Sequence, residues 1–225
     1  MYEDRALSLR EVIRTRRRPA TVVHALKGID LVVDVGESVG IVGTNGSGKS
    51  TLLRAIAGVQ PLNGGRIQIR GDAHLLGVGA AFKPLLSGYR NIYLGGLAMG
   101  MSHSEIEARL PEVLEFTELT DAIRRPLNTY SAGMRSRLAF AIATLKVPDV
   151  LLVDEALAVG DRLFRARSLE KLGEFRQQAA AVMLVTHNLN EIRKTCTRAV
   201  WIESGELVAD GPVPEVLAAY EAFRS

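Results

Sequence analysis

Nine consecutive residues have the types and spacing to bind a chain of phosphates. They match the pattern G-x-x-x-x-G-K-[ST] at every required position and read Gly43, Thr44, Asn45, Gly46, Ser47, Gly48, Lys49, Ser50 and Thr51. Glycines in such a loop permit tight turns that point backbone N–H groups at phosphate oxygens. Lys49 brings a positive charge to the outer phosphates, and the Ser50 hydroxyl can complete a magnesium shell. This phosphate loop therefore predicts binding of a nucleoside triphosphate.

The segments on either side of the phosphate loop have the order that it requires. Residues 38–42 form a short apolar run that predicts a buried strand. Residues 52–57 predict a helix that begins near Ser50 and stops at Gly58. The positive end of that helix dipole would add to the attraction for phosphate. A glycine-rich turn that carries Lys-Ser by chance is the alternative, and the strand–loop–helix order argues against it.

Acidic and imidazole side chains follow two further apolar strands. Asp154 and Glu155 come after the run 150–153, and His187 follows the run 182–186. Ligands collect at the carboxyl ends of parallel strands, so these side chains are expected to face the phosphate loop. Asp154 is placed to hold magnesium, and Glu155 to orient or deprotonate an attacking water. Solvated strand-end acids and a structural histidine are the alternatives.

A second helix terminus suits an anion. In the run 130–134, Ser131 can cap a helix that begins at Ala132, and Gly133 permits close approach of a backbone. One phosphate group cannot easily use both termini within one monomer. The second terminus is therefore expected to serve a nucleotide held by another copy of the chain.

The remaining elements must position these groups. Alternating helices and apolar strands predict an α/β fold with a largely parallel sheet covered on both faces. An antiparallel portion is expected from period-two runs at 22–35 and 66–70 and from a hairpin at 199–209. The glycine-rich stretch 77–100 is expected to be mostly loop. The further helices are expected at 104–116, with Ser104 as N-cap, and at 132–146, 163–178, 188–195 and 214–223.

Composition limits the function classes. With 225 residues the chain fits one large domain, or a core with a small subdomain. Aromatic residues at 5% argue against a stacking surface for single-stranded nucleic acid, and a net charge of +3 does not call for a nucleic-acid partner. Cys196, the single cysteine, is expected to be a half-buried small hydrophobe.

No secretory signal is expected at the start of the sequence, and no run approaches the ~20 apolar residues that cross a bilayer. A membrane role would therefore need a partner or a surface contact. Leu9, Val12 and Ile13 recur at helical spacing ahead of the basic run 14–18. This extension, residues 1–20, could be an amphipathic helix on an anionic leaflet or on a membrane partner. A solvated charged face is an equal alternative.

The order of these motifs resembles the ATPase subunit of an ATP-binding cassette (ABC) transporter, over about residues 22–223. The signature of that family is Leu-Ser-Gly-Gly-Gln. The run 130–134 departs from it at three of five positions but keeps Ser131 and Gly133, which in the family touch the partner's γ-phosphate. The runs 82–92, 130–140 and 154–161 are similar to the subfamily that exports O-antigen, capsule, teichoic acid and galactan.

The resemblance implies a P-loop ATPase core and a helical subdomain, at about residues 86–146, that carries the signature. Residues 1–225 would form a single nucleotide-binding domain without a C-terminal carbohydrate-binding domain. A homodimer would sandwich two ATP molecules. The implied roles are catalysis for Glu155, His187 and Lys49, Mg²⁺ coordination for Ser50 and Asp154, and nucleotide contact for the phosphate loop, Ser131, Gly133 and Asp161.

The resemblance also implies partners. A loop between the core and the helical region would receive a cytoplasmic helix of a polytopic membrane permease, present in two copies. The complex would export a lipid-linked polysaccharide, with this chain peripheral on the cytoplasmic face of the membrane. Two family features have no assigned residue: the stretch 77–81 lacks the expected glutamine, and His24 is only the nearest candidate for the adenine-stacking residue. A soluble ATPase acting on nucleic acid or ribosomes, or a non-catalytic nucleotide-binding module, are the alternatives.

Overall fold

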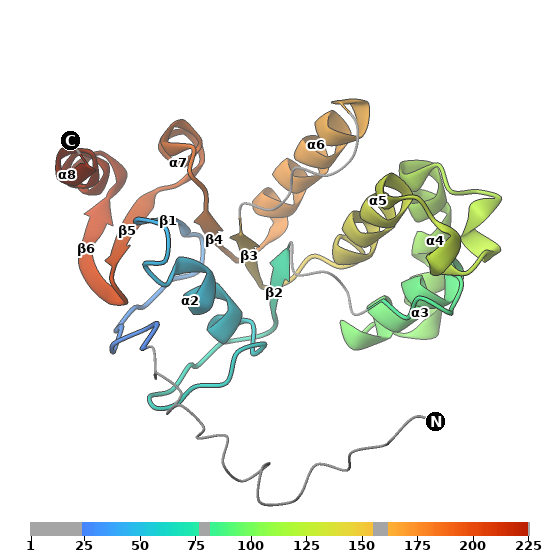
Figure 1. The fold of residues 1–225 in the computed structure, drawn as a ribbon, viewed down its shortest axis with the longest axis horizontal. Coiled ribbons are helices and arrows are strands. Elements are labelled where there is room, and N and C mark those ends of the chain that lie inside the picture. The colour runs from blue at the N-terminus through green and yellow to red at the C-terminus, as the bar shows by residue number, and fades with distance from the viewer. Residues whose placement is uncertain (1–23, 77–81, 155–161, 225) are drawn as a thin grey trace, which may run out of the picture.

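A sheet of mainly parallel strands forms the centre of the computed structural model, which describes residues 24–76, 82–154 and 162–224 (Figure 1). The strand order is β2-β3-β4-β1-β5-β6, and within these ranges only the β5–β6 pair is antiparallel. The strands are β1 (Ser38–Val42), β2 (Ala73–Leu76), β3 (Val150–Asp154), β4 (Ala181–Val185), β5 (Arg198–Glu203) and β6 (Glu206–Pro212).

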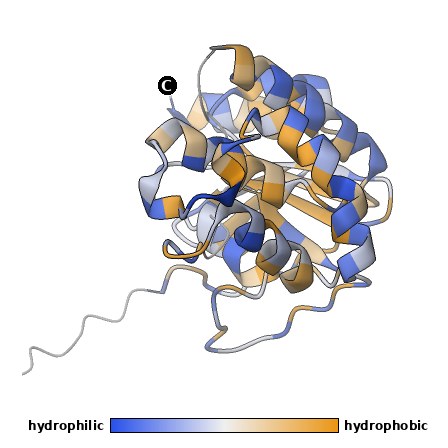
Figure 2. Ribbon diagram, turned by 90° about the vertical axis from the view of Figure 1, so that its right-hand side faces the viewer, coloured by the Kyte–Doolittle hydropathy of each residue, from blue (hydrophilic) through white to orange (hydrophobic). Residues whose placement is uncertain are grey.

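Helices cover both faces of this sheet. Helix α2 (Lys49–Ile56) packs on one face, and α6 (Arg162–Gln178), α7 (Leu189–Thr195) and α8 (Val213–Arg224) lie on the other (Figure 1). Neighbouring strand residues point to opposite faces, so Leu152 packs with Leu53 of α2 while Leu151 packs with Phe175 of α6. Apolar residues are concentrated in the strands between the helices (Figure 2). These doubly covered strands explain the continuous apolar runs in the sequence.

Three further helices form a group beside the β2 edge (Figure 1). They share an apolar core of their own, to which each contributes buried side chains such as Ile92, Ile106 and Leu138. The signature residues Ser131 and Gly133 lie at the start of one of these three helices. Its members are α3 (Gly88–Ala98), α4 (His103–Thr117) and α5 (Ala132–Ala143), with short 3₁₀ turns at Ala122–Arg124 and Leu127–Thr129.

Helix α3 corrects the expectation of a loop over 77–100. The glycines of this helix lie where neighbouring helices approach closely. A Cβ on Gly96 would lie 2.6 Å from Cγ1 of Ile106, and one on Gly95 would overlap Cγ2 of Ile142. They therefore serve packing, although they lower the intrinsic helix propensity that the sequence shows.

The start of α4 corrects the expected cap. Ser102, not Ser104, is the N-cap: its Oγ accepts a hydrogen bond from the Glu105 N–H (3.3 Å), and the Ser102 N–H donates to Glu105 Oε2 (2.7 Å). Ser104 also stands three residues before a glutamate, but Glu107 accepts hydrogen bonds from the Tyr89 and Tyr93 hydroxyls, and Ser102 with Glu105 forms the capping box.

The expected antiparallel strands at 22–35 and 66–70 are wrong within the residues described, since neither segment is a strand. The alternation at 29–33 is nevertheless real: Ile29, Leu31 and Val33 pack against the apolar core between the sheet and α2. One face of this extended segment is thus buried without a ladder of hydrogen bonds.

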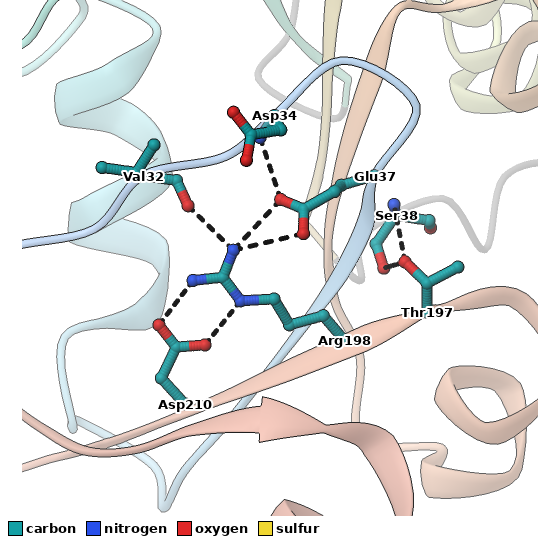
Figure 3. A network of polar contacts seen from close by, with 7 residues as sticks. All are labelled: Val32, Asp34, Glu37, Ser38, Thr197, Arg198 and Asp210. Atoms are coloured by element: carbon teal, nitrogen blue, oxygen red, sulfur yellow. Dashed lines mark hydrogen bonds and ion pairs between the residues drawn. The ribbon is translucent and has the colours of Figure 1, made fainter.

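Arg198 ties the extended segment to the sheet (Figure 3). Its Nε and Nη2 each donate to one carboxylate oxygen of Asp210 on β6 at 2.6 Å. Its Nη1 donates to the carbonyl oxygen of Val32 (2.9 Å) and to Glu37 Oε2 (3.0 Å). The hydrogen bonds to Asp210 raise the pKa of this guanidinium. One side chain therefore joins the segment before β1 to the β5–β6 pair.

Cys196 is partly buried, as the composition predicted, and burial raises the pKa of its thiol. Among the helices of the described ranges, none is both long enough and apolar enough to span a membrane.

Candidate nucleotide-binding site

The phosphate loop joins the end of β1 to the start of α2. Two of its glycines have positive φ where a side chain would clash: φ is 151° at Gly43 and 107° at Gly48. A Cβ on Gly43 would overlap the carbonyl oxygen of Ile202, and one on Gly48 would lie 2.5 Å from that of Ala25. The backbone of neighbouring segments therefore presses directly against the loop.

Lys49 directs its ammonium group into the loop. The residue is 7% exposed, and its Nζ donates to the carbonyl oxygens of Gly43 (2.8 Å) and Thr44 (2.7 Å) and to Ser47 Oγ (3.4 Å). The positive charge is thus held among loop atoms, where an anion bound by the loop would meet it.

The N-terminus of α2 is open to an anion. Its N-cap, Gly48, makes no side-chain capping hydrogen bond, and its first-turn N–H groups have no intrahelical acceptor. Asn45 and Gly46 are exposed in front of it, and Ser50 and Thr51 lie partly buried on the first turn. Uncapped N–H groups and the positive end of the helix dipole form a phosphate-binding arrangement.

Glu203 is a part of the site that sequence reasoning missed. One of its carboxylate oxygens accepts the Thr44 N–H at 3.2 Å, and the other accepts the Thr44 hydroxyl. Burial opposes ionisation, but the hydrogen bonds from Thr44 outweigh it and lower the pKa of Glu203. Only the pairing of β1 with β5, which sets Val42 beside Trp201, brings this acid to the loop.

The β5–β6 turn is hydrogen-bonded to the same loop. The Gly205 N–H donates to the carbonyl oxygen of Ser47 (2.9 Å), and its own carbonyl accepts from the Lys27 N–H (2.8 Å). The β5–β6 turn therefore holds the loop through Ser47 and is itself held by the segment at Lys27.

Strand register places the acid and the histidine at the edge where the loop begins. Asp154 and Ile41 both pair with Val185 of the strand between them. Two strand spacings separate Asp154 from β1, about 10 Å. Asp154 is partly buried, and His187 is exposed just beyond β4.

Thr186 fixes the turn that carries His187. Its Oγ1 accepts the Asn188 N–H at 3.1 Å and donates to Glu191 Oε2 at 3.3 Å. Glu155 and Asp161 lie outside the described residues, as does the stretch 77–81 in which the expected glutamine is absent.

Ser131 and Gly133, the signature residues, lie on the helical group. Ser131 caps α5 by accepting the Met134 N–H at 3.2 Å, as predicted, and both signature residues are exposed. They line a surface hollow together with Glu118 and Arg137. Helices α5 and α2 lie on opposite sides of the β2–β3 edge (Figure 1). The structure therefore does not bring the signature residues to the phosphate loop of the same chain.

A phosphate loop between a buried strand and an uncapped helix, with the Asp154 end of β3 two strands away at the same sheet edge, defines a P-loop nucleotide-binding domain. Comparison with known families gives the finer class: residues 26–158 match the ABC transporter family model. The chain belongs to the ABC transporter family. The family and the α/β fold class predicted from the sequence are confirmed.

Curated relatives carry export names. The O-antigen export system ATP-binding protein RfbB of Myxococcus xanthus is 44% identical over 92% of this chain and 48% of its own length. The teichoic acids export ATP-binding protein TagH of Bacillus cereus is 40% identical over 99% of this chain and 40% of its own length. The chain thus spans about half, or less, of these two relatives.

Solved structures share the fold. An ATP-binding subunit of an ABC transporter superposes with a TM-score of 0.73 at 26% identity, covering 88% of this chain and 87% of that one. A dimeric ATP-binding cassette in a post-hydrolysis state, bound to ADP and Pi, superposes with a TM-score of 0.66 at 25% identity. The match covers 84% of this chain and 90% of that one.

Proposed function

We propose that this chain is the ATP-hydrolysing subunit of an ABC exporter that moves a lipid-linked polysaccharide across the cytoplasmic membrane. The observation that carries the proposal is the phosphate loop, with buried Lys49 and an uncapped helix, at the same sheet edge as Asp154 and His187. The export names of the relatives support the cargo class. O-antigen-like, galactan, capsule-like and teichoic-acid-like polymers are all members of that class.

The donor set fits Mg²⁺. The Ser50 hydroxyl on the first turn of α2 and the Asp154 carboxylate at the end of β3 are oxygen ligands, which this hard cation prefers. The ion would neutralise phosphate charge when bound. Lys49 holds the outer phosphates, Glu155 takes the proton of the attacking water, and His187 contacts the γ-phosphate.

Each site is completed by a second copy. Both signature residues are exposed and lie away from the phosphate loop of their own chain, at the start of helix α5, whose N-terminus suits an anion. In a head-to-tail homodimer they would face the γ-phosphate on the partner, with Asp161 beside them. ATP binding closes the dimer and hydrolysis reopens it, which drives the membrane subunits.

Helix α3 provides the surface for a membrane subunit. A shallow groove there is lined by Leu86, Tyr89, Arg90, Tyr93 and Leu94. Next to it Leu85 and Leu97 are 80% and 42% exposed. Clustered exposed apolar residues mark interaction surfaces. A cytoplasmic helix of a polytopic permease, present in two copies, is the proposed occupant, which places this chain at the cytoplasmic face of the membrane.

Two variants test the enzymatic part of the proposal. Glu155→Gln should bind ATP with nearly unchanged affinity but lose most turnover, because it keeps the phosphate contacts and loses the base. Lys49→Ala should lose ATP affinity, since the buried cation at the loop is removed. Normal steady-state hydrolysis by Glu155→Gln, or unchanged ATP affinity of Lys49→Ala, would contradict the assigned roles.

Depletion of the protein in its native cell tests the cargo. Lipid-linked polysaccharide should accumulate inside the cell, and the chain should co-purify with a polytopic membrane protein. An unchanged glycolipid profile, with the chain recovered on ribosomes or nucleic acid, would refute the export proposal.

A further inference from the structure

Glu118, the C-cap residue directly after α4, links this helix to α5 and α6. Its Oε2 accepts a hydrogen bond from Arg137 Nη1 of α5 at 2.9 Å, and its Oε1 accepts one from Arg167 Nη2 of α6 at 2.6 Å. Each carboxylate oxygen thus joins a different helix through a charge-assisted bond. The arginines, Arg167 first, lower the pKa of this carboxyl group.

The backbone at Glu118 is in the left-handed region, with φ 57° and ψ 28°. A residue in this conformation at a helix end is usually glycine, because a Cβ there comes too close to the backbone. Among the described residues other than glycine, only Ser204 shares a positive φ. A glutamate therefore occupies a position whose backbone conformation favours glycine.

Aromatic rings from the same three helices pack against one another and against the two arginines. Phe116 of α4 lies 5.0 Å from Phe164 of α6 and 5.7 Å from Phe140 of α5, between ring centroids. Arg137 lies over the Phe164 ring at 5.4 Å and Arg167 over the Phe116 ring at 5.9 Å. Stacked guanidinium groups are held in place better than free surface arginines, so this network is more rigid than an ordinary exposed ion pair.

The network joins the signature helix α5 to α6, the helix that follows Asp161 in the sequence. Arg137 is four residues, or about one helical turn, after Gly133. Glu118 and Arg137 line the same surface hollow as the signature residues. Helix α6 begins at Arg162, and the residue before it in the sequence is Asp161.

We propose that Glu118 is a positioning residue that holds the signature helix α5 in register with α6. The carboxylate touches no nucleotide and acts through Arg137 and Arg167. It keeps the signature residues in the orientation that the nucleotide of a second copy requires. This inference rests on the proposed ATP hydrolysis by a composite site.

Glu112 provides a matched control. It also lies on α4, pairs with Lys171 of α6 and accepts a hydrogen bond from Arg109 at 3.1 Å. Both carboxylates therefore bridge α4 to α6, and Glu118 adds the bond to α5. Any loss common to the two glutamine variants reflects the α4–α6 bridge, and a loss specific to Glu118→Gln reflects the link to α5.

The test is steady-state ATP hydrolysis by the purified full chain. Glu118→Gln should lower kcat about five- to tenfold, as expected for a loss near 1–1.4 kcal/mol at the transition state, with KM within about twofold. Glu112→Gln should keep kcat within about twofold of wild type. Glu118→Gly should lower kcat by the same factor as Glu118→Gln. Its melting temperature should stay level or rise, because glycine relieves the strain of the positive φ.

Two further results decide the proposal. A double variant Glu118→Gln/Arg167→Gln should lose less than the product of the single losses, since the two groups act as one unit. Equal kcat in the two glutamine variants, or full activity of Glu118→Gly, would overturn the inference while leaving ATP hydrolysis in place. A wild-type chain without ATPase activity would overturn the proposed function and the inference with it.

Discussion

Two glycines of the phosphate loop allow a quantitative test of how the loop is held. Gly43 and Gly46 both have positive φ, 151° and 82°. A Cβ on Gly43 would overlap the carbonyl oxygen of Ile202 and lie 2.6 Å from Ser47 Oγ, whereas one on Gly46 meets nothing within 4 Å. Ile202 is fully buried in β5, so its backbone cannot easily yield.

The two alanine variants should therefore differ. Each carries the backbone penalty of about 1–2 kcal/mol for a side chain at positive φ. Gly43→Ala adds overpacking against fixed backbone, about 1–3 kcal/mol. We expect Gly43→Ala to lower the free energy of unfolding by about 2–5 kcal/mol and Gly46→Ala by about 1–2 kcal/mol.

Urea unfolding without nucleotide measures this difference, because nucleotide binding would add its own stabilisation. Equal destabilisation of the two variants would refute the conclusion that β5 presses on the loop at Gly43. A larger loss for Gly46→Ala would refute it as well.

Three other outcomes follow from single contacts. The stability that Glu203 provides over Glu203→Gln should be complete at neutral pH. Because the folded pKa is lowered, it should decrease as the pH falls below about 4.3, and urea unfolding at a series of pH values measures this. Ser102→Ala should lower stability by about 1 kcal/mol in thermal melts through loss of the α4 cap, and an unchanged melting temperature would contradict the capping box. Gly95→Ala should destabilise by about 1–3 kcal/mol against Ile142, whereas Gly173→Ala in α6, where a Cβ has open space, should be neutral or stabilising; the same sign for both would be inconsistent with this packing.

The core strands were predictable because burial on both faces makes them continuous apolar runs. Residues 38–42 were predicted with the bounds that β1 has, and β3 and β4 within one residue at each end. Helix α3 was not predictable by the same logic, because glycines that serve close packing look like breakers in a sequence. The segment 29–33 has the alternation of a strand, but alternation reports one buried face and not a hydrogen-bonded neighbour.

The residues of the candidate site also differ in how far the sequence could predict them. The phosphate loop was predictable because its chemistry lies in consecutive residues and its mechanism fixes their types. Glu203 was not, because it reaches Thr44 from 159 residues away and only strand order brings the two together. Glu118 gave no signal either, since its partners come from two other helices.

Each ATP site is proposed to combine the phosphate loop of one copy with the signature residues of another. Mixing two inactive variants, Lys49→Ala and Ser131→Arg, tests it most directly. Mixed dimers retain one intact site, so ATPase activity should return to about a quarter of the wild-type value if copies pair at random and sites act independently. A mixture as inactive as its components, or full activity of Ser131→Arg alone, would contradict the claim.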